Sequence, residues 1–143
     1  MRVMALDVGA RWVGVAVSDP TETLARPLEA LERGSKEEDV AALADLIERF
    51  QVRLLVVGHP MSLDGSQGPQ AQQIAAYADY LSEHLPVSVR LWDESFSTTE
   101  AEAIMRQNRG ERARRMARSD GGLDAIAAAV ILQRYLDRRV VGE

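Results

Sequence analysis

The sequence predicts an α/β domain built on a mixed five-stranded sheet that is flanked by helices. Residues 2–31 hold three short apolar runs separated by turn residues, which is typical of antiparallel strands joined in a meander. From residue 35 onward, two segments with helical spacing alternate with two apolar runs of strand length. This alternation is typical of parallel strands connected by helices.

The meander begins with strands predicted at Arg2–Asp7 and Trp12–Ser18. The segment between them, Val8–Arg11, contains Gly9, and a glycine is typical of a hairpin turn. A third strand is predicted near Leu24–Leu31. We expect these strands to pair antiparallel.

Helices and strands alternate in the next part of the chain. A capping-box pattern starts at Ser35, and apolar residues then recur at helical spacing as far as Phe50. The run Arg53–Gly58 is apolar without alternation, as expected of a strand buried on both faces. A glycine-rich loop follows this strand and continues to Gly68.

A second helix is predicted over Pro69–Leu85, again from helical spacing. It leads into a fifth strand over Val87–Trp92. In this strand Val87, Val89 and Leu91 should point inward, because side chains alternate between the two faces of a sheet.

The C-terminal part is predicted to contain two further helices. A short one begins with the capping pattern Ser97–Glu100 and ends near Asn108, and an alanine-rich one spans Leu123–Leu136. Between them, the segment Arg109–Arg118 holds five arginines and has no clear apolar face.

Composition limits the classes of function. With 143 residues and 46% hydrophobic content, we expect one globular domain over residues 1–143. There is no cysteine, so oxygen ligands remain for a metal, and a reducing cytoplasm fits. No apolar run reaches the roughly 18 to 20 residues of a membrane span, so we expect a soluble cytoplasmic protein. A net charge of -5 argues against a general nucleic-acid binder, although the arginine segment concentrates positive charge.

Acidic residues stand at the ends of predicted elements. Asp7 ends the first strand, Asp93 and Glu94 follow the fifth, and Asp124 lies at the start of the last helix. A fold that brings such residues together could bind a divalent metal. Alternation along a continuing strand would put Asp93 and Glu94 on opposite faces, and it does not choose between them. Each acid taken alone is equally typical of a turn, a helix start or a solvated surface.

Glycines near these acids are candidate substrate contacts. Gly9 would let a phosphate or a metal approach the backbone, and Gly14 within the second predicted strand supports the same interpretation. The loop with Gly58, Pro60 and Gly65 precedes a helix N-terminus, which attracts anions. The arginine segment could clamp a nucleic-acid backbone, with solvated surface charge as the alternative. Neither histidine is assigned a role.

Four motifs occur in order along nearly the whole chain. They are a hairpin motif at Asp7–Asp19, a glycine-proline loop at Gly58–Ala71, an acid-pair motif at Asp93–Thr98 and an alanine-rich helix at Asp124–Leu136. Together they resemble the YqgF family, also called RuvX, of bacterial pre-16S rRNA nucleases and Holliday-junction-resolvase-like proteins. The resemblance implies an RNase H-like fold.

The resemblance also implies an acidic triad of Asp7, Glu94 and Asp124 that is catalytic and holds Mg²⁺ or Mn²⁺. It thereby selects Glu94 over Asp93. Three departures from the family pattern are Arg11, where lysine is frequent, Ser95, which replaces a usual arginine, and Gly121–Leu123, which replaces a more basic lead-in to the last helix. The candidate substrate-binding residues are Gly9, Arg11, Gly58, Pro60, Gly65, Arg109, Arg112, Arg114 and Arg115.

From this resemblance we expect a nuclease that hydrolyses phosphodiester bonds in 5′-end processing of pre-16S rRNA, in cleavage of branched DNA such as a Holliday junction, or in both. We expect it to bind nucleic acid and not a membrane. The chain would be a monomer or a homodimer. One alternative is a non-catalytic nucleic-acid or ribosome-assembly protein that lost turnover through Ser95. A lower-ranked one is an ATP-binding, actin-like relative, because Asp7-x-Gly9 with Asp19 also resembles a phosphate motif.

Overall fold

Five strands form one mixed sheet in the computed structural model, which describes residues 1–59, 68–93 and 122–142. The order across the sheet is β3-β2-β1-β4-β5. Pairing is antiparallel between β1 and β2 and between β2 and β3, and it is parallel between β1 and β4 and between β4 and β5. The predicted mixed sheet is confirmed. The strands are β1 (Arg2–Val8), β2 (Trp12–Ser18), β3 (Ala25–Glu32), β4 (Val52–His59) and β5 (Ser88–Asp93).

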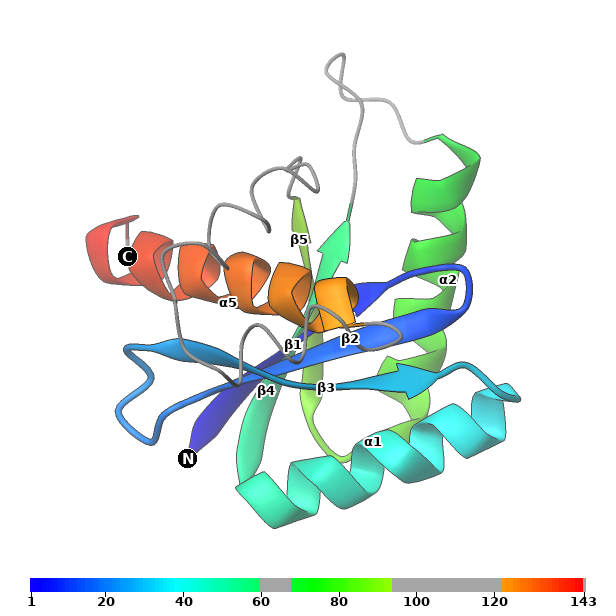
Figure 1. Ribbon diagram of the computed structural model, residues 1–143, viewed down its shortest axis with the longest axis horizontal. Helices are drawn as coiled ribbons and strands as arrows, with labels where there is room; N and C mark the ends of the chain where they lie inside the picture. Colours follow the sequence, from blue (N-terminus) through cyan, green and yellow to red (C-terminus); the bar gives the residue numbers. More distant parts are fainter. Residues whose placement is uncertain (60–67, 94–121, 143) are drawn as a thin grey trace.

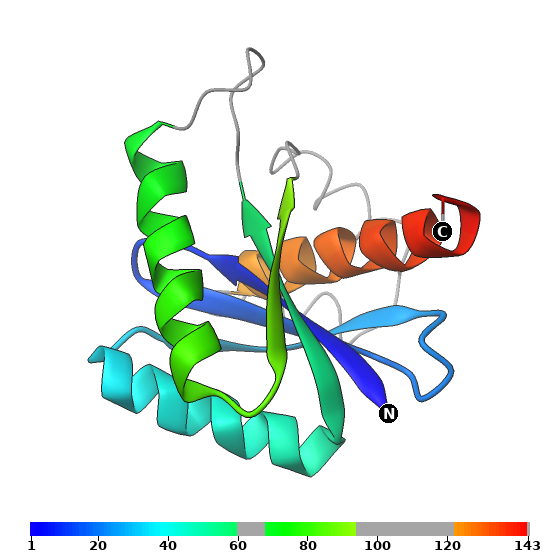
Figure 2. The ribbon, with the colours of Figure 1, turned by 180° about the vertical axis from the view of Figure 1, so that it is seen from behind.

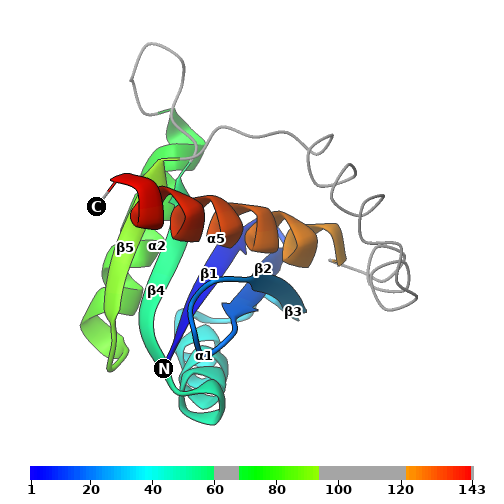
Figure 3. The same ribbon diagram turned by 90° about the vertical axis from the view of Figure 1, so that its left-hand side faces the viewer.

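Helices cover both faces of the sheet. The helices α1 (Lys36–Phe50) and α2 (Pro69–His84) lie on one face, and α5 (Gly122–Gly142) crosses the other (Figures 1 and 2). Figure 3 shows α5 along its own side of the strands. Within the described ranges, no helix combines the length and the apolar character that a membrane crossing needs. The short helix predicted at 97–108 and the arginine segment lie outside the described residues.

The alternation of side chains along β1 assigns its residues to two cores. Met4 and Leu6 belong to the core under α1 and α2, whereas Val3 and Ala5 belong to the core under α5. Asp7 has the parity of Val3 and Ala5. It therefore belongs to the α5 face, near the end of the central strand.

The start of α1 confirms the predicted capping box. Ser35 Oγ accepts a hydrogen bond from the Glu38 amide at 3.1 Å, and Glu38 Oε1 accepts one from the Ser35 amide at 2.9 Å. These bonds satisfy N–H groups that the first turn of a helix leaves without partners. They fix where the chain turns from β3 into α1.

The fifth strand differs in one respect from the prediction. Val87 and Val89 pack against the core under α1 and α2, but Leu91 is 38% exposed, so its predicted inward position is wrong. The strand lies at the edge of the sheet, where it has a neighbouring strand on one side only. On the other face, Trp92 makes an edge-to-face contact with Tyr135 of α5, with ring centroids 5.3 Å apart.

Small residues let α5 approach the sheet closely. A Cβ added to Gly14 in β2 would stand 2.0 Å from the Asp124 carbonyl oxygen, so the helix backbone occupies the space that a side chain would need. The expectation that Gly14 admits a ligand is wrong, because α5 fills this place. A Cβ on Gly58 in β4 would stand 2.5 Å from Ile131 Cδ1. Both glycines therefore serve the packing of α5.

The far end of α5 is held by charged groups. Glu22, in the turn between β2 and β3, accepts hydrogen bonds from Arg53 at 2.6 Å and from Arg139 at 2.7 Å. These cations lower the pKa of Glu22 to about 2, with burial acting in the opposite direction. The side chain of Gln133 adds bonds to the Ala25 amide at 2.8 Å and to the Thr23 carbonyl at 3.0 Å. The helix is thus fixed at both ends.

We expect Gly14→Ala to destabilise the protein more than Gly58→Ala does. The new Cβ would meet helix backbone at Gly14, but only the end of a flexible side chain at Gly58. Overpacking costs about 1–3 kcal/mol, and we expect the upper end or more for Gly14→Ala and the lower end for Gly58→Ala. Urea unfolding would measure both values.

A double-mutant cycle provides the control. Ile131→Val removes Cδ1, so it should offset part of the cost of Gly58→Ala and none of the cost of Gly14→Ala. Equal losses for the two glycine substitutions would contradict the packing argument.

Candidate active site

Asp7 and Asp124 form a carboxyl pair at one end of the sheet. Asp7 is the second-last residue of β1, and Asp124 lies in the first turn of α5. In the sheet register Asp7 stands opposite Gly14, whose missing side chain admits the backbone of Asp124. The two side chains are hydrogen-bonded to each other, and both are partly buried. The close approach of α5 thus brings two acids together that are far apart in the sequence.

A hydrogen bond between two carboxyl groups requires that one of them carries a proton. Burial, the charge of Asp124 and the shared hydrogen bond together raise the pKa of Asp7 to about 7, with burial as the largest cause. Burial also raises the pKa of Asp124, while the hydrogen bond with Asp7 opposes that increase. The pair therefore retains one proton near neutral pH, as two close carboxylates without a cation do.

The chemistry of this pair fits a divalent cation. Carboxylate oxygens are hard ligands of the kind that Mg²⁺ and Mn²⁺ prefer. A cation between them would replace the shared proton and remove the repulsion of two buried negative charges. Among the described residues, no group of three potential ligands surrounds such a position. Glu94, which the sequence motif adds to this set, lies outside the described residues.

The turn after β1 completes the described part of the site. A Cβ on Gly9 would stand 3.7 Å from Asp124 Oδ1, so the backbone of this turn lies beside the carboxyl pair. The Gly9 amide donates to the Trp12 carbonyl at 2.8 Å, which closes the hairpin. Arg33 Nη1 donates to the Gly9 carbonyl at 2.8 Å, and the Arg33 amide donates to the Arg11 carbonyl at 2.8 Å.

Arg33 is a residue that sequence reasoning missed. It follows β3 without any motif, and only the pairing of β3 with β2 brings it to the first hairpin. No signal in the sequence alone could have placed it there.

The remaining predicted contacts have different surroundings. Arg11 is exposed, pairs with Glu32 at 3.0 Å and lies over the Trp12 ring, 5.2 Å from its centroid. Gly58 lies within β4 and not in the loop after it. The other predicted positions lie outside the described residues, and they are Pro60, Gly65, Arg109, Arg112, Arg114 and Arg115.

Two polar residues near the strand ends have structural partners. Asp19 accepts hydrogen bonds from the amides of Thr23 at 2.8 Å and Leu24 at 3.0 Å, and these bonds hold its pKa well below the usual range. Asp19 therefore closes the turn between β2 and β3. His59 is buried, and its Nε2 donates to the Ala71 carbonyl at 3.1 Å.

The fold is shared with known resolvases. The structure of fowlpox virus resolvase with substrate Holliday junction DNA has a TM-score of 0.62 at 13% identity, covering 98% of this chain and 99% of that chain. The T. thermophilus RuvC complex with a Holliday junction substrate has a TM-score of 0.55 at 18% identity, covering 98% and 96%. The chain thus has the RNase H-like fold of RuvC-like resolvases, as predicted.

Sequence comparison defines the family. The family model described as "RuvX: Holliday junction resolvase" matches residues 1–138. A relative from Halothermothrix orenii, named "Putative pre-16S rRNA nuclease", is 39% identical over 137 residues, which cover 96% of this chain and 95% of the relative. A relative of the same name from Moorella thermoacetica is 40% identical over 139 residues, with 96% of each chain covered. The chain belongs to the RuvX family, which confirms the resemblance of its motifs.

The raised pKa of Asp7 predicts a pH-dependent effect of Asp7→Asn on the metal-free protein. The unfolded chain ionises Asp7 at its ordinary value of 3.8, whereas the folded chain keeps the proton up to about pH 7. The free energy of unfolding of the wild type therefore falls as the pH rises through this range. Asparagine cannot ionise, so Asp7→Asn should stabilise the protein more at pH 8 than at pH 5, by at most about 3 kcal/mol.

Thermal unfolding with a chelator at both pH values would measure the difference. Asp45→Asn, at an exposed position of α1, is the control and should show no such dependence. A stability difference between Asp7→Asn and wild type that is the same at pH 5 and pH 8 would contradict the shared proton.

Proposed function

We propose that this chain is a metal-dependent nuclease that hydrolyses phosphodiester bonds of nucleic acid, with Asp7, Glu94 and Asp124 as its acidic ligands. The observation that carries the proposal is the hydrogen-bonded pair of Asp7 and Asp124 at the end of the central strand. Membership of the RuvX family and the nuclease names of its relatives support the same reaction class. The pair gives this family assignment a chemical basis.

Glu94 is proposed as the third ligand for two reasons. The acid-pair motif of the family assigns the role to this position. In the sequence, Glu94 also has the parity of Trp92, and Trp92 packs on the α5 face, where Asp7 and Asp124 meet. In the sequence, Asp93 has the parity of Leu91, and alternation assigns this parity to the other face of the sheet.

The described residues prepare the site for a cation and a phosphate. When bound, Mg²⁺ or Mn²⁺ supplies an activated water and stabilises the charge on the leaving oxygen. Asp7 gives up its proton, and its position in β1 keeps its carboxylate on the α5 face. Asp124 is held because its backbone rests on Gly14. The Gly9 turn, fixed by Arg33, leaves backbone without a side chain beside these oxygens.

For the substrate, we propose a precursor of 16S rRNA first and branched DNA second. The names of the relatives favour the RNA, and the description of the family favours the junction. The arginines at positions 109, 112, 114 and 115 are proposed to hold the phosphate backbone, because guanidinium groups match phosphate geometry. Cleavage of a two-fold symmetric junction would need a dimer.

The ATP-binding alternative has less support. It depended on Asp19 as part of a phosphate motif, and the Asp19 carboxylate is engaged by the amides of Thr23 and Leu24. The non-catalytic alternative depends on Ser95 and remains an outcome of the experiment below.

The proposal is tested by cleavage of a pre-16S RNA fragment and a four-way DNA junction with Mg²⁺, with Mn²⁺ and with a chelator. Asp7→Asn, Glu94→Gln and Asp124→Asn should each lower the rate by about 100-fold or more, because each removes a charged ligand of the cation. Asp45→Asn should leave the rate unchanged, because Asp45 is exposed on α1 and pairs with Arg49.

Three outcomes can be told apart. Cleavage that needs the divalent ion and all three acids supports the proposal. Equal rates for wild type and Asp7→Asn contradict the assignment of the site. Binding of RNA that survives chelation, with no cleavage under either metal, supports the non-catalytic alternative.

A further inference from the structure

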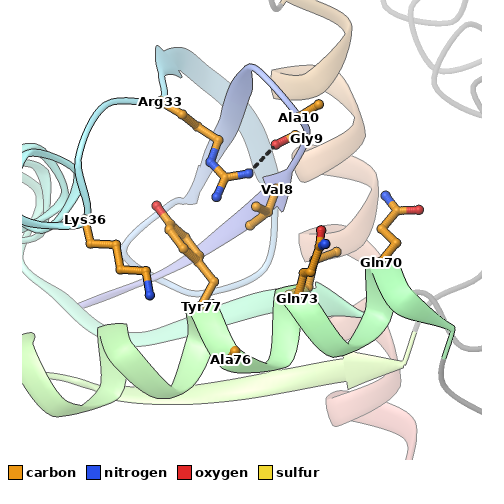
Figure 4. Close-up of a pocket in the computed structure, with 10 residues that line it drawn as sticks. Val8, Gly9, Ala10, Arg33, Lys36, Gln70, Gln73, Ala76 and Tyr77 are labelled. Carbon is orange, nitrogen blue, oxygen red and sulfur yellow. Dashed lines mark hydrogen bonds between the residues drawn. The ribbon is translucent and has the colours of Figure 1, made fainter.

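A pocket lies between the β1–β2 turn and α2 (Figure 4). It is on the α1 and α2 side of the sheet, where Val8 and Tyr77 are buried, whereas Asp7 belongs to the α5 side. Its volume is about 420 Å³, which is within the range of small-molecule binding sites. The polar groups around it come from Gly9, Arg33, Lys36, Gln70, Gln73 and Tyr77.

The pocket is positively charged. Arg33 and Lys36 line it, and none of the described lining residues is a carboxylate. Within the described part of the chain, neither cation forms an ion pair. Arg33 donates to the Gly9 carbonyl, and Lys36 Nζ lies 5.3 Å from the centroid of the Tyr80 ring. The two positive charges are therefore available to an anion.

The nearest buried acid is already engaged. Asp39 accepts hydrogen bonds from the Tyr77 hydroxyl at 2.9 Å and from the Gly34 amide at 3.0 Å. Burial and the hydrogen bond to Asp39 raise the pKa of Tyr77, so the tyrosine stays neutral. Asp39 Oδ1 accepts the bond from Gly34 and Oδ2 the bond from Tyr77, so both carboxylate oxygens already have a partner within the protein.

Arg33 is fixed before any ligand binds. Its Cζ lies 5.0 Å from the centroid of the Tyr77 ring, and Tyr77 is held by Asp39. Its Nη1 donates to the Gly9 carbonyl, as Figure 4 shows, which leaves further N–H groups of the guanidinium for a ligand. A cation held in this way loses little conformational entropy on binding.

Gly9 connects the pocket with the carboxyl pair. It lines the pocket, and its Cα also faces Asp124 Oδ1, to which an added Cβ would stand at 3.7 Å. A strand that crosses this turn can therefore present one phosphate to the acids and a neighbouring nucleotide to the cations.

We propose that this pocket binds one nucleotide of the substrate strand, next to the nucleotide whose phosphodiester is hydrolysed. Arg33 and Lys36 contact its phosphate, and the amides of Gln70 and Gln73 contact its base or sugar. The inference rests on the proposed nuclease function and adds a binding site that the acidic residues and the arginine segment do not include.

The experiment changes the charge of the pocket by substitutions at positions other than the acidic residues of the site. Ala76 is exposed on α2 and lines the pocket, so Ala76→Glu adds a negative charge there. Lys36→Gln removes a positive charge. The matched controls are Ser82→Glu on α2 and Arg49→Gln on α1, which make the same charge changes at exposed positions outside the pocket.

Binding of a labelled single-stranded RNA or DNA oligonucleotide is measured by fluorescence anisotropy at several salt concentrations. The Asp7→Asn background prevents cleavage. Ala76→Glu and Lys36→Gln should each weaken binding about 5- to 10-fold at low salt, and Lys36→Gln should reduce the salt slope by about one. Both controls should stay within about two-fold of the parent. Equal effects of pocket and control variants would overturn the inference.

Cleavage by the otherwise unchanged protein separates this inference from the proposed function. If the protein cleaves its substrate but the pocket variants bind as well as their controls, the proposed nucleotide site is overturned and the nuclease function stands. Pocket-dependent binding without cleavage supports the pocket and overturns the catalytic proposal. A protein that binds no strand overturns both. Micromolar binding of a free mononucleotide that Ala76→Glu abolishes, with no strand binding, would also overturn the proposal.

Discussion

The contact between the start of α5 and Gly14 is the constraint on which the site depends. β2 pairs with β1 so that Gly14 stands opposite Asp7, and the absence of a side chain at Gly14 lets the backbone of Asp124 rest on the strand. A larger residue would lift the helix and separate the acids. One glycine thus determines both the packing of a helix and the distance between two functional side chains.

The other contacts of α5 make this placement stable. Along the helix, Ala125 and Ala128 are buried against the sheet, and Ile131 fills the space above Gly58. At the far end, Arg139 is tied to Glu22 in the β2–β3 turn. A helix held at both ends cannot rotate its first turn away from β1 without breaking these contacts, so the position of Asp124 is fixed by the whole interface.

Placing two carboxyl groups in this position opposes folding of the metal-free chain. Their burial and mutual repulsion leave a proton on the pair near neutral pH. Favourable packing under α5 must offset this cost, which is a common property of functional sites. A divalent cation would convert the same arrangement from a source of repulsion into a ligand set. The Gly9 turn lies between this acidic side and a cationic pocket, so opposite charges are separated by a single turn of backbone.

The sequence by itself determined the elements and the family. Helical spacing, the capping box at Ser35 and the apolar run in β4 are local patterns, because hydrogen bonds and burial within one element impose them. The order of the motifs identified the family for the same reason, since each motif is a short run of residues. Only the tertiary structure decided which side chains meet. The contact of Asp7 with Asp124, the packing role of Gly14, the exposure of Leu91 and the position of Arg33 all depend on the register between segments distant in the chain, and no local pattern encodes such a register.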